Sequence, residues 1–300
     1  MDENITVGNN IENVLRENAE KVENALIGFL ADENAGSTVT TEAMRYSTLG
    51  GGKRIRAFLV MEFCRMFGGK EEAAIPFACA LECMHASSLI HDDLPCMDDD
   101  SLRRGKPSCH VQFGEAEALL AGDGLMVFAF ELCASNKYVS DRAVKLATAT
   151  LAHQSGAMGM MCGQTIDISN SVESYDELKK MYLKKTGALI KAACMLGYFA
   201  AIDRPSGSDL ENIRLYADAI GLAFQIHDDI LDVKSDTSTL GKNVGSDEKN
   251  NKKTVLSFMS MNEAEDEETL LTLLAIEAVS HYENSKNLCD LALWLLARKK

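Results

Sequence analysis

The sequence predicts an all-α protein in which one large helical bundle takes up all 300 residues. Hydrophobic residues make up 46% of the chain, aromatic residues only 6%, and just 4 prolines interrupt it. This composition favours helices packed by Ala, Leu and Met over a β-rich fold. Segment after segment also repeats apolar residues near a 3.6-residue period, and no linker rich in Pro, Gly or Ser divides the chain. One domain, 1–300, is therefore expected.

Apolar periodicity places the helices in order, and glycine or polar stretches separate them. Ile11, Leu15, Val22 and Leu26 give the first helix one apolar face. Glycines at 50–52 end one pattern before the next begins, and a polar stretch at 234–251 is long enough to be a functional loop. The expected helices are 9–31, 53–67, 73–93, 115–133, 141–161, 175–201 and 208–233, then a solvated helix starting in the acidic run 263–268 and two short C-terminal helices.

Charge and cysteine usage exclude several classes of function. The formal net charge of −15 opposes nucleic-acid binding, so no nucleic-acid partner is expected. No stretch approaches about 20 uninterrupted apolar residues, so no transmembrane segment is expected, and the N-terminus lacks the features of a secretory signal. The nine cysteines contain no Cys-x-x-Cys pair, which favours reduced core residues over a zinc site and indicates a cytoplasmic protein.

The sequence Ile-His-Asp-Asp occurs twice, at Ile90–Asp93 and at Ile226–Asp229, and each copy ends a long apolar run. A further aspartate follows each copy, Asp98 after the first and Asp232 after the second. Clustered carboxylates repel one another and are costly to desolvate unless a cation lies between them. Mg²⁺ is held by a few carboxylates together with substrate phosphates, so these clusters predict a magnesium-dependent site for an anionic ligand.

The second cluster has helical spacing. Asp228 and Asp232 are four residues apart and share a face, which Gln225 and Gly221 extend. The alternative, a solvated helix end, fits poorly because residues 219–224 are too apolar for an exposed helix.

The first cluster is less regular, because Asp92 and Asp98 are six apart and would lie on different faces of an ideal helix. Pro95 must distort the chain, which can bring Asp98 back toward Asp92. Asp99 and Asp100 are expected to be exposed or capping residues. A calcium loop is the obvious rival, but its alternating ligands and sixth-position glycine are missing.

Basic residues lie close to these acids in the sequence. Each one alone is more often a surface charge, yet together they predict a diphosphate site, since arginine and lysine are the usual partners of phosphate oxygens. Backbone amides of the adjacent glycines could add donors. The residues are Lys53, Arg56, Arg103, Arg104, Lys185 with Thr186, Lys242 and Lys252.

Taken together, these residues resemble the trans-isoprenyl diphosphate synthases of the short-chain farnesyl or geranylgeranyl diphosphate type. The resemblance runs from about Tyr46 to Asn250, and the paired aspartate-rich motifs are its most specific part. Ser101, where the family often has an acid or a small polar residue, is a modest departure. The motifs are GGKRIR (51–56), HDDLPCMDDDSLRRGKPSCH (91–110), GEAEALLAGDGL (114–125), GQTIDI (163–168), KKTGALI (184–190) and FQIHDDILD (224–232).

The resemblance implies a single polyprenyl synthase domain with the isoprenoid synthase fold around a central cavity. It also implies a homodimer, for which helix 115–133 could supply the interface. The expected reaction joins isopentenyl diphosphate head to tail to the cation formed from an allylic diphosphate, with two or three Mg²⁺ ions. Such a cation must be kept from water, which requires a dry, apolar cavity.

Residue roles follow from the resemblance by position. Asp92, Asp98 and Asp228 would ligate metal, with Asp93, Asp229 and Asp232 in support. Arg103, Lys185 and Lys242 would hold the allylic diphosphate, while Lys53, Arg56, His85 and Arg104 would hold isopentenyl diphosphate. Thr186 and Gln225 would steady the cation with their dipoles. Taken alone, His85 reads as a core histidine, but it lies seven residues before Asp92 and hence on the same face. His91 and His227 would orient their neighbouring aspartates.

Product length should depend on the residues one and two turns before Asp92. Ser88 and Ser87 stand four and five residues before it, where members that stop at fifteen carbons often carry an aromatic plug. Four residues span about 6 Å, roughly one isoprene unit. The small serines favour geranylgeranyl diphosphate over farnesyl diphosphate, with Met84 as the next candidate floor.

Other classes of function stay open at this stage. A terpene cyclase or a head-to-head synthase also ionises allylic diphosphates, but neither needs the second diphosphate pocket that Lys53, Arg56 and His85 would form. A non-catalytic partner subunit is the third alternative, although such subunits usually lose an aspartate motif and both are intact here.

Overall fold

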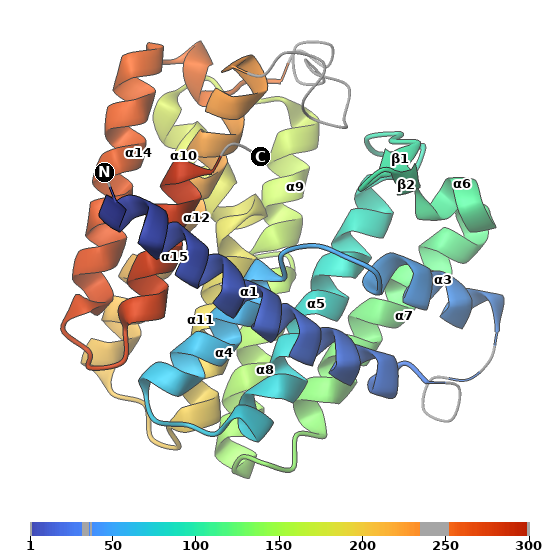
Figure 1. Ribbon diagram of the computed structural model, residues 1–300. Helices are drawn as coiled ribbons and strands as arrows, with labels where there is room; N and C mark the ends of the chain where they lie inside the picture. The colour runs from blue at the N-terminus through green and yellow to red at the C-terminus, as the bar shows by residue number, and fades with distance from the viewer. Residues whose placement is uncertain (1, 32–35, 37, 235–251, 299–300) are drawn as a thin grey trace. The chain divides into compact units, whose positions relative to one another are not determined.

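The computed structural model describes the whole chain except residues 1, 32–35, 37, 235–251 and 299–300, and it is almost entirely helical (Figure 1). The chain divides into two compact units. The N-terminal unit comprises Glu12–Leu151 and Leu196–Asp203, and the C-terminal unit comprises Met1–Ile11, Ala152–Met195 and Arg204–Lys300. Three helices contribute residues to both units: α1 (Asp2–Phe29), α8 (Asp141–Ser155) and α11 (Gly187–Ala201).

In the N-terminal unit α5 (Glu71–Asp92) packs against α4 (Ile55–Met66) and α7 (Glu115–Ala134), and the three helices lie side by side in Figure 1. Phe58, Phe77, Leu81 and Leu125 are fully buried there. α5 is long and apolar enough to cross a membrane, but 78% of its apolar window is buried, so its composition reflects its place in this core. The unit also contains α3 (Val39–Thr48), β1 (Leu102–Arg103), β2 (Lys106–Pro107) and α6 (Cys109–Phe113).

In the C-terminal unit α12 (Gly207–Lys234) packs against α14 (Met261–Ser280), which also contacts α15 (Lys286–Ala297). α9 (Met160–Ser169) packs against α10 (Tyr175–Lys185), and a single 3₁₀ turn, η1 (Val255–Ser257), precedes α14. Leu178, Ile226 and Val255 belong to the core of this unit.

The structure corrects the sequence prediction at several places: α9 was not expected as a separate helix, and one helix, α15, follows α14 in the described residues where two short ones were expected. The helix expected over 141–161 ends at Ser155, because the glycines at 156 and 159 interrupt it and an added Cβ on Gly159 would lie 1.9 Å from the Gln154 carbonyl oxygen. The helix expected over 175–201 is broken at Thr186. The sequence analysis missed α3, whose signal was the capping box that Thr38 and Thr41 form at its N-terminus.

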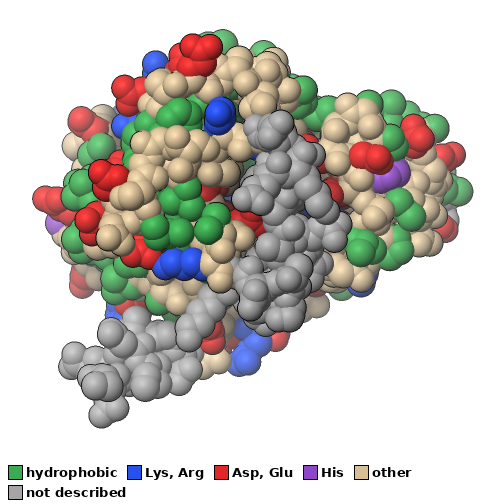
Figure 2. Space-filling model, turned by 90° about the horizontal axis from the view of Figure 1, so that it is seen from above, with side chains coloured by type: hydrophobic (Ala, Val, Ile, Leu, Met, Phe, Trp, Pro, Cys, Tyr) green, Lys and Arg blue, Asp and Glu red, His purple; other side chains and the backbone are tan. Residues whose placement is uncertain are grey.

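Acidic side chains are spread over the described part of the face seen in Figure 2, among hydrophobic and polar ones. This distribution accords with the net charge of −15, which disfavours a polyanionic partner. A site for an anionic ligand is therefore expected only where hydrogen bonds or ion pairs hold several basic side chains close together.

Candidate active site

The first Ile-His-Asp-Asp copy ends α5 and begins a turn. Asp92 is half-buried, and the Asp98 amide donates to the Asp92 carbonyl oxygen at 2.9 Å. A straight helix would have carried these residues to different faces, so the turn around Pro95 returns the chain to Asp92. The predicted return of Asp98 toward Asp92 is confirmed for the backbone.

Asp93, the next residue, has a different environment. It is 2% exposed, and Arg103 Nε lies 3.1 Å from each of its carboxylate oxygens, with Arg103 Nη2 also in contact. Arg103 stands on β1, which pairs antiparallel with β2 in a two-stranded hairpin. Asp93 thus fixes the guanidinium that was expected to hold the allylic diphosphate.

Arg104, on the same hairpin, is held by the glycine loop before α4. Its Nη1 donates to the Gly51 carbonyl oxygen at 2.6 Å. An added Cβ on Gly52 would lie 3.0 Å from the guanidinium, and Gly52 has a φ of 101°, which side-chain-bearing residues rarely adopt. The triple glycine therefore allows the backbone to approach Arg104 closely.

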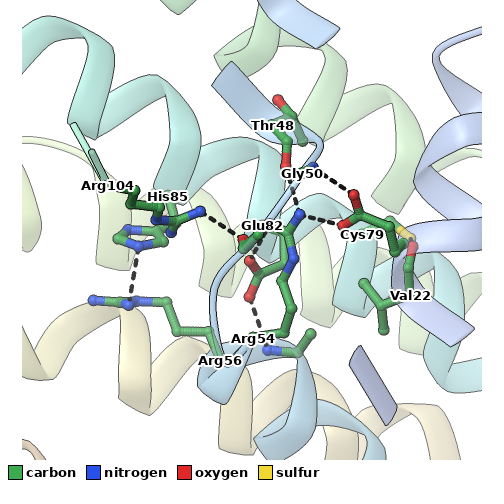
Figure 3. A network of polar contacts seen from close by, with 12 residues as sticks. Val22, Thr48, Gly50, Arg54, Arg56, Cys79, Glu82, His85 and Arg104 are labelled. Atoms are coloured by element: carbon green, nitrogen blue, oxygen red, sulfur yellow. Dashed lines mark hydrogen bonds and ion pairs between the residues drawn. The ribbon is translucent and has the colours of Figure 1, made fainter. Parts of the chain in front are cut away.

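Figure 3 shows His85 facing Arg56, with Arg104 nearby. His85 Nε2 lies 3.3 Å from Arg56 Nη1, and since a guanidinium only donates, Nε2 accepts and the ring proton is on Nδ1. Burial, then the charges of Arg56 and Arg104, hold the pKa of His85 well below its ordinary value. Near neutral pH His85 therefore offers a neutral donor rather than another positive charge. Lys53, expected to act with it, is exposed.

Arg54, within the same motif, was not singled out from the sequence. It is 6% exposed and pairs with Glu82 on α5 at 3.0 Å and with Glu23 on α1 at 2.5 Å (Figure 3). It also donates to the Thr48 carbonyl oxygen. The signal was Glu82, an acid within the apolar middle of α5, which needs a buried partner.

The second Ile-His-Asp-Asp copy lies near the C-terminal end of α12. Asp228 and Asp232 are half-buried, whereas Asp229 is 4% exposed. Asp229 Oδ2 accepts from the Tyr182 hydroxyl at 2.5 Å and from the Val255 amide at 2.8 Å. As in the first copy, the second aspartate of the pair is buried and fully engaged.

Neither histidine of the two copies orients an aspartate in the way expected. His91 lies 3.3 Å from the Leu119 carbonyl oxygen and 3.6 Å from Asp123 on α7. His227 contacts Glu268 at 2.7 Å and the Arg298 carbonyl oxygen at 2.9 Å. The polar contacts of both rings are therefore with residues of neighbouring elements rather than with the aspartates that follow them.

Lys185 and Lys252 meet at Asp167, a residue that the sequence analysis quoted within GQTIDI but did not assign. Asp167 Oδ2 lies 2.6 Å from Lys185 Nζ and 3.1 Å from Lys252 Nζ. Burial alone would raise the pKa of Asp167, but the two ammonium groups outweigh it and hold the pKa below its ordinary value. Asp167 stays ionised and fixes both lysines.

These lysines line a pocket in the C-terminal unit together with Tyr182, Gln225 and Asp229. α9 approaches it closely because residue 163 is glycine: an added Cβ there would lie 2.1 Å from the Lys185 backbone nitrogen. The structure thus gathers Lys185, Lys252, Gln225 and Asp229, which the sequence analysis had singled out separately. Lys242 lies outside the described residues.

Thr186 was expected near the middle of a helix but caps the end of α10. Its hydroxyl donates to Gln225 Oε1 at 2.9 Å. The break brings Gly187 against Gly221 of α12, where an added Cβ on Gly221 would lie 2.9 Å from the Gly187 Cα. The interruption therefore places Thr186 beside Gln225, the partner expected for it in the reaction.

Comparison with known proteins identifies this arrangement. Residues 37–291 match the family described as Polyprenyl synthetase. The chain belongs to this family. It is 46% identical to farnesyl diphosphate synthase of Escherichia coli (strain K12) over 244 residues, which cover 80% of this chain and 81% of that protein. It is 41% identical to geranylgeranyl diphosphate synthase of Cyanophora paradoxa over 279 residues, 92% of each chain.

Solved structures agree with the family assignment of this polyprenyl synthetase. A FPP/GFPP synthase from Zymomonas mobilis matches with a TM-score of 0.86 and 32% identity, over 96% of this chain and 99% of that one. The predicted all-α fold and the resemblance to prenyl diphosphate synthases are therefore confirmed.

The aspartates of this polyprenyl synthetase offer oxygen donors only, the ligands that Mg²⁺ prefers. In the described part of the chain, no three acidic, His or Cys side chains gather closely enough to hold a metal ion by themselves. An ion at either motif would therefore complete its coordination with water and ligand oxygens. That donor set fits Mg²⁺, which retains several waters and binds through one or two carboxylates plus phosphates.

The three residues proposed to set product length are all on α5. Met84 is fully buried, Ser87 is 1% exposed, and Ser88 is half-buried with its hydroxyl donating to the His85 carbonyl oxygen. Ser87 Oγ has no hydrogen-bond partner among the described residues. A larger side chain at residue 87 would therefore break no hydrogen bond of the serine hydroxyl.

Proposed function

We propose that this enzyme condenses isopentenyl diphosphate head to tail with allylic diphosphates up to a C20 product, geranylgeranyl diphosphate, with farnesyl diphosphate as the alternative product. The enzyme is a short-chain prenyltransferase that uses isopentenyl and allylic diphosphates. The observation that carries the site assignment is the repeated pattern of a half-exposed first aspartate, Asp92 and Asp228, beside a buried second aspartate.

Metal binding is assigned to Asp92, Asp98, Asp228 and Asp232, each of which is half-buried. Two or three Mg²⁺ ions, when bound, would neutralise the diphosphate and stabilise its departure. Asp93 and Asp229 support the site indirectly, because Asp93 holds Arg103 and Asp229 holds Tyr182 and Val255. Both are already engaged by groups that fix them.

The allylic diphosphate is assigned to Arg103, Lys185 and Lys252, with Lys242 joining them by resemblance. The first three are each prepositioned by a carboxylate, Asp93 or Asp167. A cation fixed before the charge develops stabilises the leaving diphosphate without having to reorganise. Lys53, Arg56, Arg104 and neutral His85 are assigned to isopentenyl diphosphate.

The reaction breaks the carbon–oxygen bond of the allylic diphosphate to give an allylic cation and diphosphate. The alkene of isopentenyl diphosphate attacks that cation, and the proton lost from the adduct passes to the departed diphosphate. The Thr186 hydroxyl oxygen and the Gln225 amide oxygen are the dipoles assigned to the cation, and their mutual hydrogen bond of 2.9 Å fixes both.

The decisive experiment incubates the purified chain with Mg²⁺, isopentenyl diphosphate and each of the C5, C10 and C15 allylic diphosphates, then sizes the products by chromatography. C20 product from all three starters is expected. Turnover of an allylic diphosphate without isopentenyl diphosphate would instead favour a cyclase or a head-to-head synthase. No turnover by the chain alone would favour a non-catalytic subunit.

A matched pair of lysine variants tests the isopentenyl diphosphate assignment. Lys53→Ala should raise KM for isopentenyl diphosphate by about tenfold, since a lost charged contact to phosphate costs roughly 1.5 kcal/mol or more. The control is Lys70→Ala, because Lys70 is an exposed lysine at the N-terminal end of α5, opposite the end that carries Asp92. This variant should leave KM for isopentenyl diphosphate unchanged. Equal KM values in both variants would contradict the assignment.

Product length is tested by Ser87→Tyr, which should shorten the product to farnesyl diphosphate. Ser87 is nearly inaccessible, so an aromatic ring there must fill neighbouring space. Unshortened products from a folded variant would show that the cavity floor lies elsewhere.

A homodimer through α7 is also proposed. Leu119, Leu120 and Val127 on this helix are 48%, 55% and 67% exposed, and Leu120 and Val127, seven residues apart, share a face. Such an apolar stripe is typical of an interface. Light scattering should give a dimer that Leu120→Arg combined with Val127→Arg converts to monomer; a monomeric parent enzyme would contradict it.

A cytoplasmic location is proposed from the nine free cysteines. Burial raises the pKa of Cys64 and Cys133 to about 12, so these thiols resist oxidation as inert core residues. Fractionation of the native host should place the enzyme in the reducing compartment, and recovery in an oxidising one would contradict this.

A further inference from the structure

Arg298, which follows α15, is held in place through its backbone by a buried histidine. The Arg298 carbonyl oxygen lies 2.9 Å from His227 Nε2, and because that oxygen only accepts, the imidazole donates. The other ring nitrogen, Nδ1, lies 2.7 Å from Glu268 Oε1 on α14. The His227 and Glu268 side chains are 8% and 6% exposed, so α14 fixes the ring and the ring fixes the end of the chain.

The Arg298 side chain then reaches the second aspartate motif. Its Nη2 contacts Asp228 Oδ1 and lies 3.4 Å from the Phe224 carbonyl oxygen, and its Cζ lies 4.1 Å from the Phe224 ring centroid. The Arg298 side chain is 9% exposed, whereas that of Asp228 is 42% exposed. A buried, oriented guanidinium therefore meets the accessible carboxylate that the proposed function assigns to metal.

We infer that Arg298 is a positioning residue for Asp228: a tethered cation that occupies this carboxylate until a divalent ion arrives together with diphosphate. The inference rests on the proposed metal role of Asp228. A bare divalent ion must displace the guanidinium from Asp228 Oδ1 and then remain near its positive charge. A metal accompanied by diphosphate meets less opposition, because the freed guanidinium can bind phosphate oxygens.

The experiment titrates Mn²⁺, a paramagnetic stand-in for Mg²⁺, into the full-length protein without diphosphate and follows free Mn²⁺ by electron paramagnetic resonance. Arg298→Met keeps an apolar stem against Phe224 and should bind Mn²⁺ about fivefold more tightly, since a competing positive charge is gone. Lys234→Met is the charge-matched control: it removes a cation of α12 that pairs with Glu265 and should change Mn²⁺ affinity less than about twofold. Unchanged or weaker binding by Arg298→Met would overturn the inference.

Two further variants separate this inference from the proposed function. In an Asp228→Asn background the gain from Arg298→Met should vanish, because the shared carboxylate is gone. If Asp228→Asn itself leaves Mn²⁺ binding intact, the metal role of Asp228 fails and the inference with it. If Asp228→Asn weakens binding but Arg298→Met does not strengthen it, only the role of Arg298 fails.

His227→Phe tests the tether by removing the ring that holds the Arg298 backbone while leaving both Arg298 and Asp228 in place. It should reproduce at least part of the Mn²⁺ gain and speed amide hydrogen exchange in the last turn of α15, because the backbone of Arg298 is released. With inorganic diphosphate present, the gain in Arg298→Met should fall below about twofold, since the guanidinium then has an anion to bind. A full gain that persists with diphosphate would argue against loading of metal and diphosphate together.

Discussion

The two copies of Ile-His-Asp-Asp share a burial pattern but differ in how the buried aspartate is compensated. Asp93 and Asp229 are 2% and 4% exposed, while the aspartate before each is half-buried. Asp93 pairs with a guanidinium, that of Arg103. Asp229 instead accepts from two neutral donors, the Tyr182 hydroxyl and the Val255 amide.

This difference shows which part of a repeated motif is set by local geometry and which by its surroundings. Consecutive residues on a helix point about 100° apart, so one aspartate turns inward as its neighbour turns outward in both copies. The compensation depends on what lies opposite, a charged hairpin in one unit and the start of a 3₁₀ turn in the other. Equivalent functions for the first aspartates and unequal energetics for the second are therefore expected.

The strongest test of equivalence replaces the first aspartate in each copy. Asp92→Asn and Asp228→Asn should each lower kcat by about 10³-fold, because each removes a charge that would hold metal against the leaving diphosphate. Steady-state kinetics with geranyl diphosphate measures this, with exposed Asp99→Asn as the control. If one of the two variants lowered kcat by less than about tenfold while the other lowered it by about 10³-fold, the two motifs would not be functionally equivalent.

The second aspartates should differ in stability. Asp93→Asn leaves Arg103 without its buried counter-charge and should cost about 3–5 kcal/mol of unfolding free energy. Asp229→Asn loses hydrogen-bond quality to neutral donors and should cost about 1–3 kcal/mol. Urea denaturation measures the unfolding free energy of both variants. A larger loss in Asp229→Asn than in Asp93→Asn would contradict the proposed difference in compensation.

Two glycines beside the motifs extend the comparison to backbone packing. An added Cβ on Gly163 would lie 2.1 Å from the Lys185 backbone nitrogen, whereas one on Gly122 would lie 2.2 Å from His91 Nε2. A backbone cannot move aside as a ring can, so Gly163→Ala should cost about 3 kcal/mol and Gly122→Ala about 1 kcal/mol. Gly163→Ala should also raise KM for the allylic diphosphate by displacing Lys185. If urea denaturation gave equal losses of unfolding free energy for Gly163→Ala and Gly122→Ala, this reasoning would be contradicted.

The smallest expected effect is a pH dependence from His85, on the helix that ends in the first copy. His85 lies seven residues before Asp92, and the matching position before Asp228 is Gly221. Because the pKa of His85 is lowered in the folded state, the unfolded chain binds more protons below about pH 6.5, and stability should fall as pH drops through that value. His85→Gln should therefore lose less Tm between pH 7.5 and pH 5 than the parent enzyme does. Parallel Tm profiles would show that His85 contributes none of this dependence.

Local patterns predicted most helices and the aspartate motifs, because they depend on residues near one another in the chain. The return of Asp98 could be expected from Pro95 alone. Arg54, Asp167 and Arg298 could not be assigned this way, since their partners lie far along the sequence: Glu82 for Arg54, Lys252 for Asp167 and Asp228 for Arg298. Charge alone does not reveal which distant acid a basic residue will meet.

The break at Thr186 illustrates the same limit. Apolar spacing ran through 175–201 without interruption, so one helix was expected. The close approach of Gly187 and Gly221 accompanies the break, and no propensity within α10 or α11 signals that contact. The glycines were visible in the sequence, but the contact between them was not.

The apolar character of α5 has a consequence for biosynthesis. A helix with a membrane-like window of which 78% is buried must leave the ribosome before α7, which covers it, has been made. Until then the nascent chain exposes an apolar segment that can bind other polypeptides or lipid bilayers. Ribosome-bound chains in which α5 has emerged from the exit tunnel but α7 has not should therefore recruit chaperones more strongly than chains in which α7 has emerged as well, and equal recruitment would show that α4 alone shields the segment.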